Sequence, residues 1–215
     1  MLELVIKAAL SYLLGSLVGS LLIGKLRGVD IRTMGSGNAG ATNALRTQGK
    51  AVGLTVLAID LAKGWVATAW LAHAALPMIL PAAPAFAAWT MPVCGLGVML
   101  GHIYPCWFGF RGGKGVATLV GVLLGISGWL LLVFLATFLV TVMIFGWVSF
   151  GSMLGTAAVA VAIAVGNFPP RGPLVAFALT ALMLVLYAHR GNIARIRAGT
   201  ESRAKRLWLL RGRVA

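Results

Sequence analysis

The chain has 215 residues, of which 60% are hydrophobic, and its formal net charge is +14 because only four residues are acidic. Its mean hydropathy is +0.97. A soluble domain of this size would expose far too much apolar surface, so the composition predicts a polytopic membrane protein. In a soluble protein such a positive net charge would suggest nucleic acid as a binding partner. Here the positions of the cations favour membrane topology and anionic ligands, and we expect no nucleic-acid partner.

Seven apolar segments predict seven transmembrane helices, at residues 2–24, 52–75, 85–102, 114–127, 129–146, 150–166 and 172–189. The runs are continuously apolar and do not alternate, which favours helices over a barrel. The first run lacks a strongly basic leader and a small-residue cleavage site, so we interpret it as a retained span. Between 114 and 166 the predicted breaks are Ser127-Gly128 and the stretch from Gly146 to Gly151.

The cations predict the orientation of these spans. With the N-terminus outside, only Lys7 and Arg171 would lie on the outer side, and Lys63 would lie within the second span. The inner side would hold Lys25, Arg27, Arg32, Arg46, Lys50, Arg111, Lys114 and the tail from Arg190. This asymmetry predicts a cytoplasmic C-terminus. We expect one integral-membrane domain over residues 1–215, with a basic amphipathic, lipid-facing tail from about residue 190.

The first polar motif is GSGNAGATNALR at residues 35–46, lodged between hydrophobic segments. Glycines let the backbone turn and bring its N–H groups close to a ligand. Ser, Thr and Asn side chains add hydrogen bonds, and Arg46 adds a planar fork suited to phosphate or carboxylate. The motif predicts an anion-binding loop at a membrane surface.

The second polar motif is GHIYPCWFGFRGGKGVAT at residues 101–118. It is similar to a phosphate loop but fails the Walker pattern. Gly109 and Gly113 are separated by only three residues, and Gly115 follows Lys114 where Ser or Thr should stand. A nucleotide triphosphatase is therefore disfavoured. Glycines around a lysine at a helix start still suit an anion, and the alternative is a basic loop that only obeys topology.

Two further polar groups lie at predicted span ends on the same side of the membrane. Ser149, in VSFGS at residues 148–152, begins the sixth span and could alternatively be a simple helix cap. His189 and Asn192 are three residues apart where the last span ends, and they share a face if the helix continues. The alternative for His189 is an amphipathic anchor.

Within the second span, Asp60 and Lys63 predict a structural ion pair facing the bundle interior.

Some chemistries can be disfavoured from the sequence. No Ser-His-Asp set can be argued, because Asp30 and Asp60 are the only aspartates and neither lies beside a histidine in sequence. The His-x4-Asp acyltransferase pair is missing, and no metal-ligand cluster is seen. Cys94 and Cys106 are interpreted as packing thiols. The remaining Lys, Arg, Ser, Thr, Asn, His and backbone N–H groups suit acyl or phosphoryl transfer, since they can bind phosphate and stabilise an oxyanion.

The runs GSGNAGATNALR, GHIYPCWFGFRGGKGVAT, VSFGS and HRGNI together resemble the acyl-phosphate:glycerol-3-phosphate acyltransferase family of the PlsY type. The resemblance implies a bacterial seven-span inner-membrane enzyme with a cytoplasmic site. Such enzymes transfer a fatty acyl group from acyl phosphate to the 1-hydroxyl of glycerol 3-phosphate, giving lysophosphatidic acid and inorganic phosphate. It also implies glycerol 3-phosphate, a long-chain acyl phosphate, membrane lipid and an upstream acyl-phosphate-forming enzyme as partners, with no cofactor and no metal.

Carried over by motif, the resemblance implies Ser36, Lys114 and His189 as catalytic residues. It implies as substrate-binding residues Gly37, Asn38, Thr42, Asn43, Arg46, His102, Gly112, Gly113, Ser149 and Asn192. Family members often carry an arginine-aromatic pair where this chain has Gly146-Trp147, and an acidic residue where it has Gly191.

The mechanism we expect is direct attack of the acceptor hydroxyl, with the leaving phosphate or His189 accepting the proton, since no carboxylate is evident in sequence. A Ser36 acyl-enzyme is the competing mechanism. The alternative function is a transporter for a phosphorylated metabolite, but no half-chain repeat is seen. A bare lipid-surface scaffold would leave the glycine loops unexplained.

Overall fold

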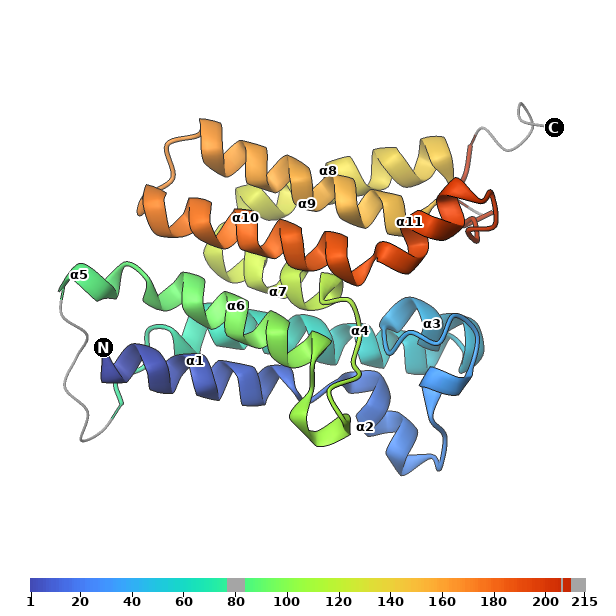
Figure 1. The fold of residues 1–215 in the computed structure, drawn as a ribbon, viewed down its shortest axis with the longest axis horizontal. Helices are drawn as coiled ribbons and strands as arrows, with labels where there is room; N and C mark the ends of the chain where they lie inside the picture. The colour runs from blue at the N-terminus through green and yellow to red at the C-terminus, as the bar shows by residue number, and fades with distance from the viewer. Residues whose placement is uncertain (77–83, 206, 210–215) are drawn as a thin grey trace. The chain divides into compact units, whose positions relative to one another are not determined.

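The computed structural model describes residues 1–76, 84–205 and 207–209, and every regular element in those ranges is a helix (Figure 1). The chain divides into two compact units, unit 1 (Met1–Ser127) and unit 2 (Gly128–Ala215), and each is described here by itself.

Unit 1 is built from two pairs of long helices that pack closely. Its α-helices are α1 (Leu2–Gly15), α2 (Gly19–Leu26), α3 (Ala41–Thr47), α4 (Lys50–Trp65), α5 (Pro84–Ala87), α6 (Thr90–Ile103) and α7 (Val116–Ile126). A π-helical segment, Val66–Leu71, continues α4, and short 3-10 turns cover Ile31–Thr33 and Cys106–Phe108. α1 packs on α6, and α4 packs on α7. A Cβ on Gly101 would collide with the carbonyl oxygen of Tyr12, so this glycine lets α1 and α6 approach at backbone distance.

The first span is not the single helix over residues 2–24 that the hydropathy predicts. α1 and α2 are bent by 46° at a break between Gly15 and Gly19. Side chains of α4 form hydrogen bonds with the backbone groups at this break. Lys63 Nζ donates to the carbonyl oxygens of Gly15 at 2.8 Å and Leu17 at 3.1 Å. Asp60 Oδ1 accepts from the Gly19 N–H at 3.2 Å. Backbone groups in an apolar layer must find hydrogen-bond partners within the protein. Hydropathy carries no information about such partners, so it could not predict the break.

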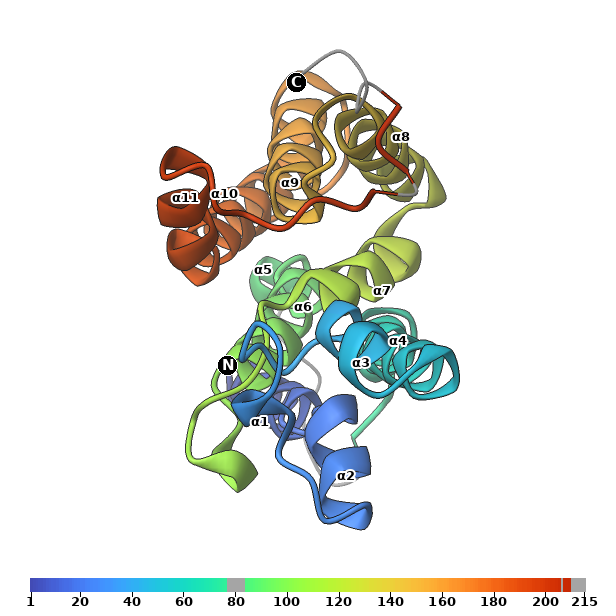
Figure 2. The ribbon, with the colours of Figure 1, turned by 90° about the vertical axis from the view of Figure 1, so that its right-hand side faces the viewer.

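Unit 2 is a three-helix hairpin array with a short fourth helix. Its elements are α8 (Gly128–Phe145), α9 (Val148–Val165), α10 (Arg171–Ala188) and α11 (Arg190–Arg197). α9 packs against both α8 and α10, and Figure 2 shows these three helices close to end-on. The predicted break at Ser127-Gly128 is confirmed. The second break is Gly146-Trp147, which is narrower than the predicted stretch to Gly151.

The described part of the tail after α11 turns back onto the α8–α9 connection. The Ala204 N–H donates to the carbonyl oxygen of Gly146 at 2.7 Å, and Trp208 Nε1 donates to that of Ile144 at 3.0 Å. These bonds satisfy carbonyls at the C-terminal end of α8 that have no intrahelical partner. Residues 206 and 210–215 of the predicted lipid-facing tail lie outside the described residues, and its contact with lipid stays a prediction.

Five helices in the described residues are long and apolar enough to cross a membrane: Lys50–Leu71, Thr90–Phe108, Gly128–Phe145, Val148–Val165 and Arg171–Ala188. The bent α1–α2 pair would make a sixth. The predicted span at 114–127 contains α7, whose 11 residues rise only about 16 Å, roughly half of a hydrocarbon core. Seven spans and the orientation of the termini therefore stay predictions.

Candidate functional site

The glycine-rich loop of the first motif is held in shape by Asn43. The Asn43 side chain donates to the carbonyl oxygens of Ile31 and Met34 at 3.2 and 3.0 Å, and its Oδ1 accepts from the Ser36 N–H at 3.0 Å. A buried amide satisfied on both sides fixes the backbone around it. Asn43 was predicted to bind substrate, but this geometry gives it the task of shaping the loop. Its direct contact with substrate stays a prediction.

The second motif lies against the first at Gly113. The Gly112 N–H donates to the carbonyl oxygen of Ile103 at 3.0 Å, and the Gly113 N–H donates to that of His102 at 3.1 Å. A Cβ on Gly113 would collide with His102 Nε2 and would lie 2.9 Å from the carbonyl oxygen of Ala39. Only glycine fits here, because the two loops and the imidazole approach at backbone distance.

Lys114 stands directly before the N-terminus of α7, as the sequence predicted. Gly115 adopts a left-handed conformation with φ of 80°, and α7 begins at Val116 without a side-chain cap. Lys114 is half-buried and precedes the first residue of this helix by two positions. Backbone N–H groups, the helix dipole and an ammonium in one place favour a phosphate oxygen.

Arg32, in the short turn just before the first motif, holds that turn against the second motif, a role that sequence reasoning did not assign to it. Its Nη1 donates to the carbonyl oxygens of Phe108 at 2.9 Å and Arg111 at 3.1 Å. Its Nη2 pairs with Asp30 Oδ2 at 2.8 Å. The side-chain and backbone hydrogen bonds from Arg32 hold the pKa of the Asp30 carboxyl below its ordinary value. The turn Ile31–Thr33 and the second motif, 76 residues apart along the chain at the Arg32–Phe108 contact, are thereby held together.

Behind these loops lies a buried charge cluster of Asp60, Lys63 and His102. Lys63 Nζ lies 3.0 Å from Asp60 Oδ1, which confirms the predicted ion pair. Lys63 Nζ is also 3.0 Å from His102 Nδ1, and Asp60 Oδ1 is 3.4 Å from that nitrogen. An ammonium can only donate, so Nδ1 accepts, and a neutral ring carries its proton on Nε2, toward Gly113. The sequence placed no aspartate near a histidine, and the fold does.

The remaining predicted residues of unit 1 belong to the first loop and lie mostly at the protein surface. Ser36, Gly37, Thr42 and Arg46 are exposed, and Asn38 is half-buried. Among the described residues no hydrogen bond or ion pair occupies the side chains of Ser36, Thr42 or Arg46. These groups are available to a ligand, in contrast to Asn43 and His102, which are engaged inside the protein.

In unit 2, the predicted residues Ser149 and Asn192 meet at a residue that sequence reasoning missed, Glu201. Ser149 Oγ and Asn192 Nδ2 donate to Glu201 Oε1 at 2.6 and 2.5 Å, and Arg195 Nε donates to Oε2 at 2.7 Å. Ser149 is therefore not a helix cap, since the cap position of α9 is Trp147. Burial opposes ionisation of Glu201, but the hydrogen bonds from Ser149, Asn192 and Arg195 outweigh it and lower the pKa of the carboxyl.

A signal for Glu201 existed in the sequence. It is the one acidic residue in the basic stretch from Arg190 to the end of the chain. A single carboxylate among many cations is a natural centre for hydrogen bonds and an ion pair. The spacing to its partners, up to 52 residues, gave no local pattern to recognise.

His189 is buried at the junction of α10 and α11, with 2% of its surface exposed. Its Nδ1 lies 2.8 Å from the carbonyl oxygen of Val185. A carbonyl can only accept, so Nδ1 carries the proton and Nε2 is the basic nitrogen of the neutral ring. The helix does not run on unbroken, as the shared-face prediction assumed, because α10 ends at Ala188 and α11 begins at Arg190. Both His189 and Asn192 are nevertheless buried in unit 2.

The His, Cys, Asp and Glu side chains of the described residues can be compared with the geometry of metal sites and disulfides. Across residues 1–76, 84–205 and 207–209 no group of three or more His, Cys, Asp or Glu side chains is placed to hold a metal ion. Cys94 and Cys106 are both free thiols, as predicted. Unit 1 has two glycine-rich loops with a lysine at a helix start, and unit 2 separately has a buried histidine, a hydroxyl and an amide. That inventory fits transfer chemistry on an anionic substrate.

Comparison with known proteins identifies relatives over nearly the whole chain. A family model described as glycerol-3-phosphate acyltransferase matches residues 5–199. The glycerol-3-phosphate acyltransferase of Geotalea daltonii is 43% identical over 196 residues, which cover 91% of this chain and 95% of that protein. That of Geobacter sulfurreducens is 40% identical over 205 residues, covering 95% of this chain and 100% of the relative.

Solved structures of the same family share the fold. A crystal structure of PlsY (YgiH), an integral membrane glycerol 3-phosphate acyltransferase, in its glycerol 3-phosphate form has a TM-score of 0.82 and 34% identity. The alignment covers 93% of this chain and 94% of that one. The lysophosphatidic acid form has a TM-score of 0.81, 33% identity and coverage of 96% and 98%. The chain thus belongs to the glycerol-3-phosphate acyltransferase family and has the integral-membrane fold of PlsY.

Proposed function

We propose that this protein transfers a fatty acyl group from acyl phosphate to the 1-hydroxyl of glycerol 3-phosphate, giving 1-acyl-glycerol 3-phosphate and inorganic phosphate. The observation that carries the proposal is the meeting of the two glycine-rich loops at Gly113, next to Lys114 and the start of α7. This arrangement suits a phosphate group, and the family relationship supplies the acceptor. The acyl-phosphate donor follows from the resemblance of the motifs.

In unit 1, Lys114 with Gly112 and Gly113 would hold the phosphate of the donor, and Lys114 would stabilise charge that develops on its carbonyl oxygen. Ser36, Asn38, Thr42 and Arg46 would line the other side of the substrate. The donor is a mixed anhydride and is already activated, so orientation and electrostatic stabilisation supply much of what the reaction needs. Asn43 and His102 would act from behind, by fixing the two loops.

In unit 2, Ser149, His189 and Asn192 would contact glycerol 3-phosphate. The sequence suggested that no carboxylate was at hand as a base, and Glu201 corrects that view. Its lowered pKa and its three hydrogen bonds make Glu201 a weak base and a good anchor. The hydroxyl proton would therefore pass to the leaving phosphate or to Nε2 of His189, whose Nδ1 is held by Val185.

We also propose the topology that the cations favour: seven spans, with α7 as the short one, an outer N-terminus and a cytoplasmic C-terminus. The two compact units would then form one functional domain in the bacterial inner membrane. The substrate-binding loops would face the cytoplasm, where an upstream enzyme supplies acyl phosphate.

The reaction is tested by measuring inorganic phosphate released from palmitoyl phosphate by detergent-purified protein, with and without glycerol 3-phosphate. Release that depends on the acceptor and matches lysophosphatidic acid mole for mole is the expected result. Release without the acceptor would indicate a hydrolase. No release from a folded preparation with several chain lengths would refute the acyltransferase.

The first variant to test is Lys114→Ala, which we expect to lose roughly 3 kcal/mol or more of transition-state stabilisation, about a hundredfold in kcat. Lys50→Ala removes an exposed cation of α4 outside the two loops and is the matched control. Near-normal turnover by Lys114→Ala would show that its assigned role is wrong.

Ser36→Ala separates the two mechanisms. Direct attack predicts that the variant keeps measurable turnover, because only a hydrogen bond to substrate is lost, at about 0.5–1.5 kcal/mol. An acyl-enzyme on Ser36 predicts complete loss in a folded protein, together with a covalent acyl adduct on the wild-type chain by mass spectrometry. The adduct would decide against direct attack.

A further inference from the structure

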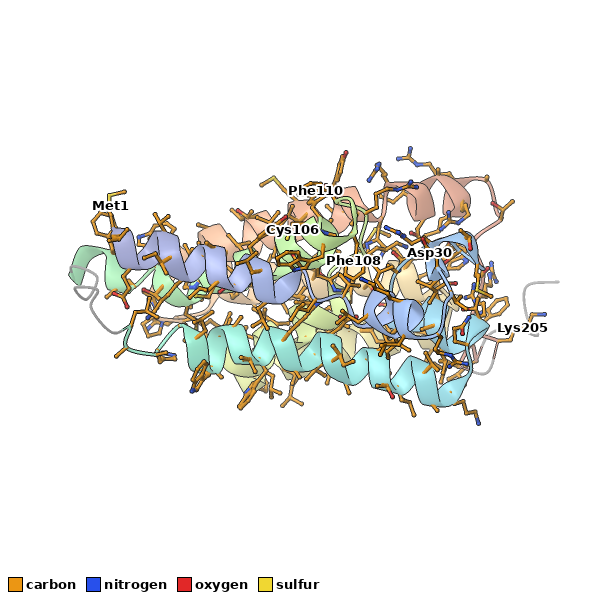
Figure 3. The ribbon with its side chains drawn as sticks, turned by 90° about the horizontal axis from the view of Figure 1, so that it is seen from below. Met1, Asp30, Cys106, Phe108, Phe110 and Lys205 are labelled. Carbon is orange, nitrogen blue, oxygen red and sulfur yellow. The ribbon has the colours of Figure 1, made fainter. Side chains whose placement is uncertain are left out.

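Unit 1 contains a hollow of about 600 Å³ apart from the residues predicted to act on substrate. Its lining includes Lys25, Asp30, Arg32, Trp107 and Arg111, and none of the predicted catalytic or substrate-binding residues lines it. Its volume is within the range of pockets that hold small organic groups. Figure 3 views this side of the chain, with Asp30, Phe108 and Phe110 labelled.

The hollow carries positive charge that the protein does not neutralise. Its lining has three cations and one carboxylate, and Asp30 is already paired with Arg32 at 2.8 Å. In the described part of the chain the side chains of Lys25 and Arg111 make no hydrogen bond or ion pair. Arg111 also interacts electrostatically with the Asp30 carboxylate, but three cations around one carboxylate still leave an excess of positive charge. That excess favours an external anion.

The rim of the hollow is aromatic and exposed. Trp107, in the lining, and Phe110, beside it, are each 60% exposed. Phe110 also has φ of 57°, a left-handed conformation that is unfavourable for a bulky side chain. The Phe110 backbone is held by a hydrogen bond from its N–H to the carbonyl oxygen of Pro105, while its ring points away from the protein core. Two exposed aromatic rings at one rim favour an apolar partner outside the protein.

The position of the hollow indicates which partner this is. Lys25 is in the last turn of α2, where the bent α1–α2 pair ends, and Trp107 is at the end of the candidate span Thr90–Phe108. The ends of spans lie at the boundary of lipid and water. Tryptophan is enriched there, and lysine and arginine there attract anionic lipid.

We propose that this hollow binds the phosphate headgroup of an anionic phospholipid, with Lys25 and Arg111 on the phosphate and with Trp107 and Phe110 against the glycerol and upper acyl chains. A free soluble phosphate would use the cations but would leave the exposed rings unexplained. The site goes beyond the acyl transfer reaction, because lipid binding here needs no turnover.

Native mass spectrometry of detergent-purified protein titrated with phosphatidylglycerol or phosphatidylcholine of the same chain length tests the proposal. We expect phosphatidylglycerol to bind preferentially. The double variant Lys25→Gln/Arg111→Gln should weaken that binding roughly 10- to 30-fold, at about fivefold for each cation. The control Arg27→Gln/Lys50→Gln removes two exposed cations outside the hollow and should bind like wild type. Neither measurement involves substrate, so the result is independent of the proposed reaction.

A second variant guards against loss of fold. Phe110→Gly removes the ring and also the unfavourable φ, so its melting temperature should equal or exceed that of wild type while its lipid binding falls. Equal binding of the two lipids, equal losses in the two double variants, or unchanged binding by Phe110→Gly would each overturn the proposal. Full displacement of phosphatidylglycerol by millimolar inorganic phosphate would do the same, because it would identify the ligand as a soluble anion.

Discussion

Asp60 in unit 1 and Glu201 in unit 2 are both carboxylates that hold separate segments together, but they do so in different surroundings. Asp60 is completely buried, and its Oδ1 lies near Lys63, His102 and the Gly19 N–H. Its Oδ2 has no hydrogen-bond partner within the part of the chain that the structure describes. The Glu201 side chain is 8% exposed and both of its oxygens accept hydrogen bonds.

The difference shows what each anion depends on. Asp60 is stabilised chiefly by one ammonium in an apolar layer, so its environment becomes unfavourable once that ammonium is removed. The Glu201 carboxylate accepts hydrogen bonds from a hydroxyl, an amide and a guanidinium near the end of a helix. Its stabilisation therefore does not depend on any single donor. Unit 1 is therefore expected to respond sharply to one substitution, and unit 2 more gradually.

The largest effect is expected for Lys63→Met. It leaves the Asp60 carboxylate buried without its cation and frees the carbonyls of Gly15 and Leu17, so the free energy of unfolding should fall by about 3–5 kcal/mol. Unfolding in detergent, followed by temperature or denaturant, measures it. The double variant Asp60→Asn/Lys63→Met should recover much of the loss. If the single and double variants were equally unstable, the unpaired carboxylate would not be the cause.

A smaller effect is expected for Glu201→Ala. Ser149, Asn192 and Arg195 lose their common acceptor, which should lower the free energy of unfolding by about 1–3 kcal/mol. Glu201→Gln keeps an oxygen for Ser149 and Asn192 and loses only the charge, so its melting temperature should lie between those of wild type and Glu201→Ala. If Glu201→Ala lowered the free energy of unfolding as much as Lys63→Met does, unit 2 would be as sensitive to one substitution as unit 1, and the contrast drawn between them would be wrong.

The smallest effect is the pH dependence that Glu201 contributes. Its pKa in the folded protein is lowered, so the unfolded chain binds the proton more tightly. The stability from Glu201 should be fully present above the unfolded value of about 4.3 and should be lost as the pH falls through the folded value. The difference in melting temperature between wild type and Glu201→Gln should therefore shrink in acid. A difference that grew as the pH fell would reverse the assigned sign.

These cases also show how far the sequence alone could go. The Asp60–Lys63 pair was predictable because i,i+3 spacing on a helix is a local rule, and Lys114 at a helix start was predictable from its glycines. Most helix positions followed from hydropathy. The contacts of Glu201 and Arg32 join segments 52 and 76 residues apart, and no local period encodes such distances. The convergence of the predicted site residues on one reaction stays a prediction.

The break between α1 and α2 has a consequence for how the shape of this protein arises. The polar groups that stabilise the corner, Asp60 and Lys63, belong to α4, while Leu2–Leu26 itself has no proline at the bend. Taken alone in a bilayer, that stretch would lack the α4 side chains that pair with the Gly15 and Leu17 carbonyls and with the Gly19 N–H, and a straight helix would leave fewer such groups unpaired. The corner is thus a property acquired on assembly: one segment's geometry is encoded in another segment's side chains.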